Sequence, residues 1–503
     1  MGRDSKIKHF LDSVHGTINI PSEYCDKIID TCYFQRLRRI EQNSCRSVFP
    51  SARHDRFIHS LGVFHLGMLI VDSINNKCKN LLPPNAEKIF NTYKMACLLH
   101  DVGHTPFSHT FEEFFDRGRI EEALKAELNN PDFSSDIDNG RKAAQHHEAL
   151  SAYISLTIFK EVLLSLDIDL ELLVRMITGY KYLRNNVPIP SFENSMIELI
   201  HGDLIDADGL DYVCRDVWAG GYRNFTIDID RLINSIEIVY NNTSGYSVAY
   251  NAKALNEIET VLNIKNFQYL YVIKHHKVLL EQYLLVEAMK YAACYHLDLP
   301  DDSADERDNA LRSLCDFHAY ITPKSLSQSK YKLHRPTDDD FVALMKLYDT
   351  ENMYIRQWFS RKYDATPLWK SKMEYFSVFK PVFQSLSEEE YKNIHTILIS
   401  PECKHYLCAQ FNLQESDVIV IEVKPKLRKL EEERIYIKLN DNIKPYSELS
   451  HDMFSVVGTE LPFCYMYINL NALGADDKIM HIKTIISRIK DFLLMELREK
   501  WDE

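Results

Sequence analysis

Residues 99–109, Leu99-His-Asp-Val-Gly-His-Thr-Pro-Phe-Ser-His109, are the most informative stretch of this sequence. The apolar run from Ile89 to Leu99 has the spacing of a buried helix, and the pair His100 and Asp101 follows at its end. An adjacent histidine and aspartate can bind one cation when a helix presents both to a cavity. Because this dipeptide also occurs often by chance, its meaning depends on the residues around it.

Other segments supply residues of the same chemistry. A helix expected over Arg56 to Ile74 places Arg56 and His59 on one face. Much further along the chain, Asp208, Tyr212 and Asp216 fall at four-residue steps and share a helical face. Two imidazoles and two carboxylates suit a divalent cation such as Mn, Fe, Mg, Ni or Zn.

Composition narrows the class of protein. The chain has 503 residues, a net charge of −14 and 11 cysteines. A net-acidic chain has no overall attraction for nucleic acid or anionic membrane, so a bound phosphate needs local cations or a metal. The odd number of cysteines and the absence of a C-x-x-C pair predict reduced thiols in a cytoplasmic protein. The apolar runs are far shorter than the ~20 residues of a membrane helix, so we expect no membrane span.

The periodicity predicts a mainly α protein with a small C-terminal α/β lobe. Helical spacing dominates about the first 290 residues, although the polar stretch from Asp116 to Ala144 reads as a loop or insertion. Near the C-terminus the pattern predicts strands and a final helix: Val418 to Val423, Arg434 to Leu439, Phe463 to Leu470, and Lys478 to Glu499. We expect a core over 1–250, a helical extension over 251–400 that completes the active site and an oligomer interface, and the α/β lobe over 401–503.

Taken together, the motifs resemble those of the HD-domain deoxynucleoside triphosphate (dNTP) triphosphohydrolases. This group includes bacterial dGTPases and the mammalian antiviral HD triphosphohydrolase. The likeness covers about the first 230 residues, and the order, spacing and flanking residues of the motifs all agree. The matching stretches are Val14 to Ile18, Ile29 to Arg38, Arg56 to Val63, Leu99 to His109, His147-Glu148, and Asp208 to Asp216. The fold that the resemblance implies is an HD-domain helical core.

The resemblance also implies roles for individual residues. It makes His59, His100, Asp101 and Asp208 the metal ligands. Arg56 matches a phosphate-contacting arginine, and Tyr212 and Asp216 match residues that contact the deoxyribose. His104, His109 and His147 match active-site histidines, with His109 and Glu112 as a candidate acid–base pair. The implied reaction is attack of water or hydroxide on the α-phosphorus, which releases a deoxynucleoside and inorganic triphosphate.

Two cations of the closest relatives are missing here. Gly209 stands where a lysine commonly follows the last metal aspartate, and Asn266 stands where an arginine contacts phosphate. A glycine-rich loop of those relatives is replaced by Asn43 to Ser47. Lys265 or Arg46 is in a position to substitute, and we include Lys265 among the substrate-binding candidates. The preferred base is left open by these changes.

A second nucleotide site is a further expectation. Asp30, Gln35 and Arg38 match residues that read an activating guanine nucleotide in the mammalian relative. The alternative is that these residues belong to an ordinary helix surface. An activator site would lie at a subunit interface, so we expect a homo-oligomer (dimer, tetramer or hexamer) whose assembly is coupled to nucleotide binding.

Alternative functions remain open at this point. One is an HD phosphohydrolase for a nucleoside monophosphate, a cyclic nucleotide or an alarmone. Another is a non-catalytic nucleotide sensor, with nucleic acid as a partner that is allowed but not required. A dNTP hydrolase would serve nucleotide-pool control or antiviral (antiphage) defence. The reaction products separate the enzymatic alternatives.

Overall fold

The structure is a computed structural model. It describes most of the chain, in these ranges: 6–139, 144–183, 188–202, 204–222, 225–241, 245–321, 333–348, 352–384, 386–425, 435–440, 442–449, 461–474 and 478–502.

The chain forms two compact units, each built from separate segments of sequence. Unit 1 contains Met1–Asn266, Met289–Tyr348 and Arg428–Met453. Unit 2 contains Phe267–Ala288, Asp349–Leu427 and Phe454–Glu503. These units are defined by spatial compactness, whereas the expected parts 1–250, 251–400 and 401–503 were defined by sequence order and function. That three-part division stays a prediction.

Buried helices form the centre of unit 1. Helix α3 (Arg56–Lys77) contacts α4 (Ala86–Leu99) and α11 (Ala207–Ala219), and α4 also contacts α9 (Leu170–Thr178). Apolar side chains of α4, from Ile89 to Leu99, are almost all buried, as the run before His100 predicts. Helix α3 begins at Arg56 because the Asp55 side chain accepts the backbone N–H of Ile58 at 2.9 Å. The described chain is mainly α, which confirms the expected fold class.

Other helices complete the described chain. In unit 1 they are α1 (Ser22–Tyr24), α2 (Cys32–Gln35), α7 (His146–Ile158), α8 (Lys160–Ser165), α10 (Pro188–Glu198), α12 (Ile229–Ile233), α13 (Leu255–Phe267), α15 (Ala304–Leu314), α16 (His318–Ile321), α17 (Asp338–Leu347) and α22 (Tyr446–Leu449). Helix α18 (Met353–Ser360) belongs to unit 2, and α14 (His276–Leu297) contributes residues to both units.

The stretch from Asp116 to Ala144 is not the loop that its polarity predicted. It contains α5 (Arg117–Leu128) and α6 (Pro131–Asn139). Two polar residues of the stretch lie at the ends of α5: Asp116 accepts the backbone N–H of Arg119, and Asn129 ends α5 in a left-handed conformation. Three apolar side chains fix both helices to the core because they are fully buried: Ile120, Leu124 and Phe133.

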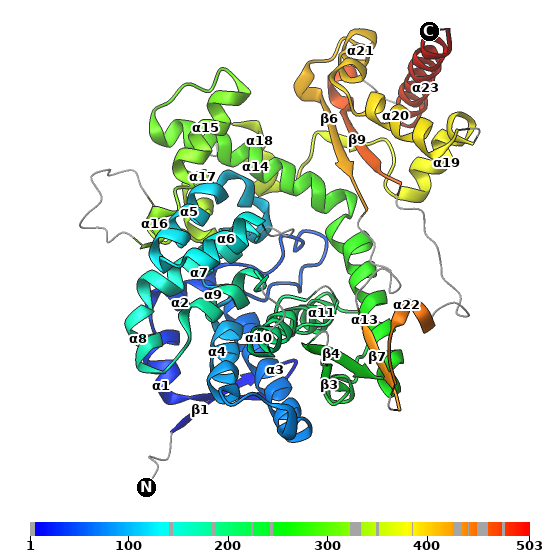
Figure 1. The fold of residues 1–503 in the computed structure, drawn as a ribbon. Coiled ribbons are helices and arrows are strands. Elements are labelled where there is room, and N and C mark those ends of the chain that lie inside the picture. The colour runs from blue at the N-terminus through cyan, green and yellow to red at the C-terminus, as the bar shows by residue number, and fades with distance from the viewer. Residues whose placement is uncertain are drawn as a thin grey trace. The chain divides into compact units, whose positions relative to one another are not determined.

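Two small sheets belong to unit 1. Strands β1 (Ile7–Asp12) and β2 (Gly16–Pro21) form an antiparallel hairpin. The second sheet has the order β3-β4-β7-β8, with β3 (Ile236–Asn241), β4 (Gly245–Asn251), β7 (Tyr436–Leu439) and β8 (Asn442–Pro445). Figure 1 shows the orange strand β7 beside the green strand β4, and the two pair in parallel. The strand expected near Arg434 to Leu439 therefore forms, but in unit 1 and not with the other C-terminal strands.

Unit 2 contains the remaining expected strands. Its sheet has the order β5-β9-β6, all antiparallel, with β5 (Ala365–Pro367), β9 (Phe463–Asn469) and β6 (Val418–Val423). The helices α19 (Lys372–Phe383), α20 (Glu388–Leu398) and α21 (Pro401–Phe411) each contact the final helix α23 (Lys478–Asp502). Buried Trp369 fixes the sheet locally by donating its indole N–H to the Cys464 carbonyl at 2.6 Å. A small α/β arrangement near the C-terminus is confirmed.

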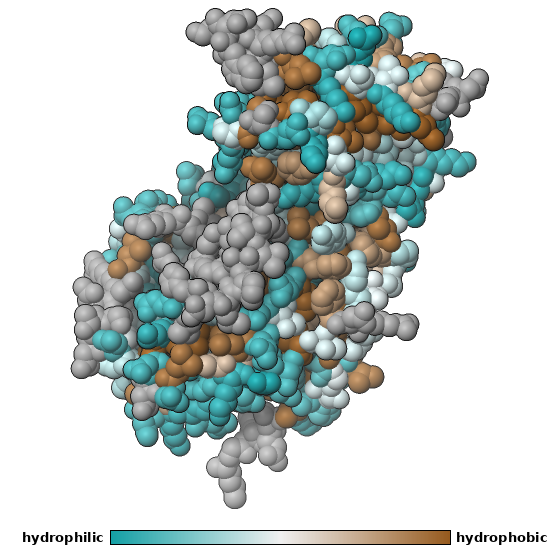
Figure 2. Space-filling view, turned by 90° about the vertical axis from the view of Figure 1, so that its right-hand side faces the viewer, coloured by the Kyte–Doolittle hydropathy of each residue, from teal (hydrophilic) through white to brown (hydrophobic). Residues whose placement is uncertain are grey.

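Among the described residues, α3 is the one helix long and apolar enough to cross a membrane, and most of it is buried inside the protein. It carries Arg56 and His59, so its apolar character reflects a core position. On the face shown in Figure 2, hydrophobic areas lie among hydrophilic ones.

Candidate metal centre and active site

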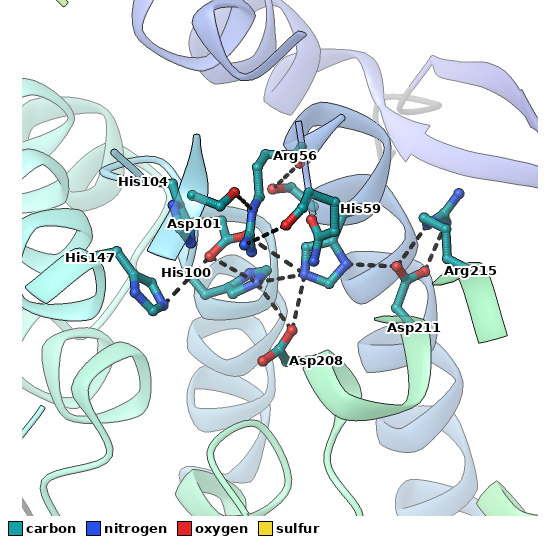
Figure 3. A network of polar contacts seen from close by, with 12 residues as sticks. Arg56, His59, His100, Asp101, His104, His147, Asp208, Asp211 and Arg215 are labelled. Carbon is teal, nitrogen blue, oxygen red and sulfur yellow. Dashed lines mark hydrogen bonds and ion pairs between the residues drawn. The ribbon is translucent and has the colours of Figure 1, made fainter. Parts of the chain in front are cut away.

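Three side chains from different helices converge at the centre of unit 1. His59 lies on α3, His100 follows the end of α4, and Asp208 lies in the first turn of α11. His59 Nε2 is 3.0 Å from Asp208 Oδ1 and 3.3 Å from His100 Nε2. Their ligand atoms all lie within 4.8 Å of one another. Figure 3 shows the three side chains pointing toward one another. The three side chains therefore come together only when α3, α4 and α11 pack against one another.

Asp101 completes a set of four. Its Oδ2 is 3.6 Å from His59 Nε2, and its Oδ1 is 3.5 Å from His100 Nε2. Arg56 donates to Asp101 Oδ2 at 2.7 Å. Burial raises the pKa of Asp101, but Arg56 and His100 outweigh this effect and hold the pKa well below its usual range. The carboxylate is therefore ionised and available as a ligand.

The chemistry of this donor set fits a divalent cation. Two imidazole Nε2 atoms face each other at 3.3 Å, and two carboxylates lie beside them: buried Asp101 and partly exposed Asp208. Their negative charge would balance the positive charge of a metal. Mixed imidazole and carboxylate ligands are typical of first-row divalent metals. The structure thus brings together all four residues that the sequence suggested: His59, His100, Asp101 and Asp208.

A buried carboxylate behind the cluster orients His59. Asp211 is fully buried, and its Oδ2 lies 2.7 Å from His59 Nδ1 (Figure 3). Arg215 donates to both oxygens of Asp211 at 2.8 Å, and His15 Nε2 lies 2.6 Å from Oδ1. Burial raises the pKa of Asp211, but Arg215 outweighs it and holds the pKa well below its usual range. Asp211 therefore accepts the Nδ1 proton of His59, which leaves Nε2 to face the cluster.

This network extends to the β1–β2 hairpin. Arg215 donates to Asp12 at 2.8 Å, and Asp12 accepts the backbone N–H groups of Val14 and His15. Gly62 lies against the same carboxylate, because an added Cβ would lie 1.9 Å from an Asp211 oxygen. Sequence reasoning missed these residues as functional. The available signal was the i,i+4 spacing of Asp211 and Arg215, with Asp211 three residues after Asp208 on the same side of the helix.

A second polar cluster lies beside the first. Glu112 Oε1 is 2.5 Å from His147 Nδ1 and 3.1 Å from His109 Nδ1. His104 stacks on His147 with ring centroids 4.3 Å apart. His147 also approaches the metal cluster, since its Nε2 is 4.0 Å from Asp101 Oδ1. The structure therefore brings together His104, His109, Glu112 and His147, as their assignment to one active site requires.

The protonation of this cluster follows from burial and from one carboxylate. Burial lowers the pKa of His147, but Glu112 outweighs it and raises the pKa to about 9. Burial raises the pKa of Glu112, yet His147 and His109 hold it well below its usual range. Burial and Arg56 keep the pKa of His104 well below its usual range, so this ring is neutral. Neither nitrogen of His104 has a hydrogen-bond partner among the described residues.

The residues assigned to the deoxyribose and phosphates do not all face the clusters. Asp216 Oδ1 lies 2.7 Å from His54 Nε2, so it belongs to a pair of its own. Lys265 is buried, donates to the Leu204 carbonyl at 2.7 Å, and lies 5.3 Å from the centre of the Tyr212 ring. Its ammonium occupies the space above Gly209, because an added Cβ there would lie 2.5 Å from Lys265 Nζ.

The expected activator residues are divided between two places. Asp30 pairs with Lys8 at 3.0 Å, whereas Arg38 donates to Gln35 at 2.9 Å. Gln35 and Arg38 line a cavity of about 730 Å³ that Asp30 does not line. Three more arginines line the same cavity: Arg39, Arg46 and Arg53.

Comparisons with known proteins agree with this geometry. The HD domain family matches residues 56–178, which contain Arg56, His59, His100 and Asp101. A putative HD domain-containing protein of Acanthamoeba polyphaga mimivirus is 29% identical over 295 residues, covering 55% of this chain and 56% of the relative. The deoxynucleoside triphosphate triphosphohydrolase SAMHD1 of Mus musculus is 32% identical over 238 residues, covering 46% of this chain and 34% of the relative. The chain thus carries an HD domain, and its relatives include dNTP triphosphohydrolases.

A solved structure extends the likeness to the fold. A phosphohydrolase from Bacteroides thetaiotaomicron superposes with a TM-score of 0.60 over 92% of this chain and 99% of that one, at 20% identity. At this identity the match concerns the fold alone. The chain spans about half the length of the mimivirus relative and a third of the mouse one.

Proposed function

We propose that this protein is a metal-dependent dNTP triphosphohydrolase that releases a deoxynucleoside and inorganic triphosphate. The observation that carries this proposal is the adjacency of two clusters. A four-residue donor set for a divalent cation lies within 4.0 Å of a histidine–glutamate cluster, with His147 between them. Relatives that hydrolyse dNTPs support the choice of substrate.

His59, His100, Asp101 and Asp208 would hold the cation. When bound, a divalent cation supplies positive charge to phosphate oxygens and lowers the pKa of a water molecule. Arg56 adds a second cation at the same place. It holds Asp101, and it also donates to Ser108 Oγ at 3.0 Å and to the Gln42 carbonyl at 3.2 Å, so its position is fixed before substrate arrives.

His109 is our candidate for the acid that protonates the departing 5′-oxygen. Its side chain is 57% exposed, whereas Glu112 and His147 are buried, so it is the accessible member of the cluster. Glu112 orients His109 from its Nδ1 side, which directs Nε2 away from the carboxylate. His147, protonated beside Glu112, adds positive charge near the phosphates. Tyr212 would contact the sugar, and Asp216 would reach it only after leaving His54.

Lys265 supplies the phosphate cation that Gly209 cannot. The ammonium lies above Gly209 although it comes from α13 and not from α11. Lys265→Gln should raise KM for the triphosphate about 10-fold or more, because a charge-assisted hydrogen bond is lost. Lys253→Gln, at an exposed lysine of the same unit, is the matched control and should leave KM unchanged. Equal KM values for both variants would remove Lys265 from the site.

The central experiment incubates purified protein with each dNTP and Mn or Mg, singly and in mixtures. Ion-exchange chromatography resolves the products, and Asp101→Ala is assayed in parallel. Deoxynucleoside plus triphosphate, lost in Asp101→Ala, is the expected result. Orthophosphate or pyrophosphate would instead indicate the alternative, an HD phosphohydrolase for a monophosphate, a cyclic nucleotide or an alarmone. No turnover despite bound metal would indicate a nucleotide sensor.

Regulation and assembly form a separate proposal. The cavity next to Gln35 and Arg38, which is lined by both arginines and carboxylates, is where we place an activating nucleotide, and we expect a homo-oligomer. Activity that appears only in nucleotide mixtures, with a matching increase of mass in light scattering, is the expected result. The proposal would be contradicted if single nucleotides and mixtures gave equal activity and the mass of the protein assembly stayed constant. Cytoplasmic location and a role in dNTP-pool control or antiphage defence stay predictions.

A further inference from the structure

The loop between His104 and His109 has an unusual backbone. Phe107 and the next residue, Ser108, both have φ of 53°, in the left-handed region. Non-glycine residues adopt this region rarely, and two in succession are rarer, so surrounding contacts must hold the conformation. The loop places two histidines of the active-site cluster on either side of this strained pair.

Asp338 is the side chain that contacts the strained pair from a distant part of the sequence. It is the first residue of α17, and its Oδ1 accepts the backbone N–H of Phe107 at 2.6 Å. Its Oδ2 accepts the backbone N–H of Glu41 at 2.9 Å. One buried carboxylate thus joins two segments that both reach the site: Glu41 accepts Ser108 Oγ through its carbonyl, and the next residue, Gln42, accepts Arg56.

Arg36 strengthens the same attachment from the other side of the loop. Its guanidinium donates to the carbonyls of Val102 and His104, and to the Pro336 carbonyl two residues before Asp338. The Tyr320 ring lies 4.6 Å from this guanidinium. Arg36 and Asp338 therefore satisfy carbonyl and N–H groups at opposite ends of the loop, and both are buried.

The position of Asp338 is itself fixed. Thr337 caps α17, and its hydroxyl and backbone N–H both donate to the Asp340 carboxylate. Phe341, one turn further along, packs on Phe111 with ring centroids 5.1 Å apart. Burial raises the pKa of Asp338 to about 7, because a buried carboxylate loses its hydration. The backbone N–H groups of Glu41 and Phe107 act in the opposite direction, since they stabilise the charged carboxylate.

We propose that Asp338 is a positioning residue, which holds the loop of His104 and His109 in its left-handed conformation by accepting the Phe107 N–H. The consequence for catalysis rests on the proposed function, whereas the consequence for the loop does not. Asp338 touches neither cluster, so its removal should change the placement of His104 and His109 and leave the metal ligands intact.

The test compares Asp338→Asn with Asp305→Asn. Asparagine retains one oxygen that can accept a backbone N–H, but it would turn N–H donors toward the second backbone N–H. Asp305 is the matched control because it also lies in the first turn of a helix of unit 1, α15, is exposed, and does not line the cavity next to Gln35 and Arg38. Amide hydrogen exchange over residues 102–111 reports on the loop, and kcat, KM and bound Mn report on the site.

We expect Asp338→Asn to accelerate exchange in this segment and to lower kcat about 10–100-fold, because a small displacement of acid groups has a large effect on rate. KM and bound Mn should stay within about threefold of wild type. Unchanged exchange, exchange that accelerates uniformly over the chain, or an equal effect of Asp305→Asn would overturn the proposal.

A second variant covers the case in which Asp338→Asn does not fold. Thr337→Ala removes the cap of α17 and leaves the carboxylate in place, so it should accelerate exchange in the same segment by a smaller factor. No change there would overturn the proposal. If wild type hydrolyses no dNTP, the proposed function fails while the exchange result still decides the role of Asp338 in the loop.

Discussion

The two halves of the candidate site differ in how completely their side chains are held. Around the metal cluster, His59 is fixed by Asp211, and Asp211 accepts from Arg215 twice and lies against His15. In the histidine–glutamate cluster, Glu112 serves two histidines, His109 is largely exposed, and His104 has no hydrogen-bond partner among the described residues. The first half is built to hold an ion in place, and the second has groups that can move protons. Their difference predicts which substitutions remove metal and which remove only activity.

The largest effect should come from Asp211→Ala. This change leaves buried Arg215 without its principal partner and frees the Nδ1 side of His59. Breaking one side of a buried ion pair lowers the free energy of unfolding by ~3–5 kcal/mol. Losing the carboxylate behind a metal-binding histidine weakens metal affinity ~10–100-fold. Urea unfolding and metal titration followed by elemental analysis measure the two effects. Metal affinity equal to wild type would contradict the orienting role of Asp211.

His109→Gln should have the opposite signature. We expect kcat to fall ~10²–10⁴-fold, which is the usual contribution of a general acid. Bound metal and melting temperature should stay at wild-type values, because the His109 side chain is largely exposed and lies outside the metal donor set. Steady-state kinetics and elemental analysis of the same preparation give the comparison. A parallel loss of metal would show that the two halves are not independent.

The pH dependence of stability should distinguish the halves as well. The pKa of His147 is raised to about 9 in the folded protein, above the usual 6.5. Its stabilising contribution is therefore fully present below pH 6.5 and is lost as pH rises through about 9. At ~1.4 kcal/mol per pKa unit, the loss is at most ~3.5 kcal/mol. Urea unfolding of wild type and His147→Gln, both in EDTA so that no metal is bound, should show this slope only in wild type. Identical slopes would contradict the His147–Glu112 pairing.

The smallest effect concerns close packing behind the metal cluster. Gly62→Ala places a methyl group 1.9 Å from an Asp211 oxygen, and overpacking of this kind lowers stability by ~1–3 kcal/mol. The matched control is Gly118→Ala in α5, where the nearest atom would be 3.5 Å away. That change should be neutral or slightly stabilising, since alanine favours helix. Thermal unfolding of both variants gives the comparison. Equal melting temperatures would show that Asp211 and its partners accommodate the added methyl group without loss of stability.

Short-range patterns predicted much of the fold and the site. Helices α3 and α4 follow from helical spacing, and α11 contains the predicted four-residue steps of its polar residues. The four metal-cluster residues follow from the family motifs on and next to these helices. What the sequence did not show depends on partners far apart in the chain. Asp12 meets Arg215, Asp338 meets Phe107, and β7 meets β4 across distances that no local periodicity encodes. Between 116 and 139, helices were taken for a loop, in part because residues such as Asp116 and Asn129, which lie at helix ends, are also common in loops.

The parallel pairing of β4 and β7 constrains the order in which the chain can mature. The two strands are almost two hundred residues apart in sequence, and segments of unit 2 lie between them. During synthesis from the N-terminus, the edge of β4 that pairs with β7 stays unpaired until Tyr436–Leu439 has left the ribosome. Pairing over such a separation is slow, and an unpaired strand edge attracts other chains. Nascent and truncated forms of this protein should therefore depend on chaperones far more than the finished chain does.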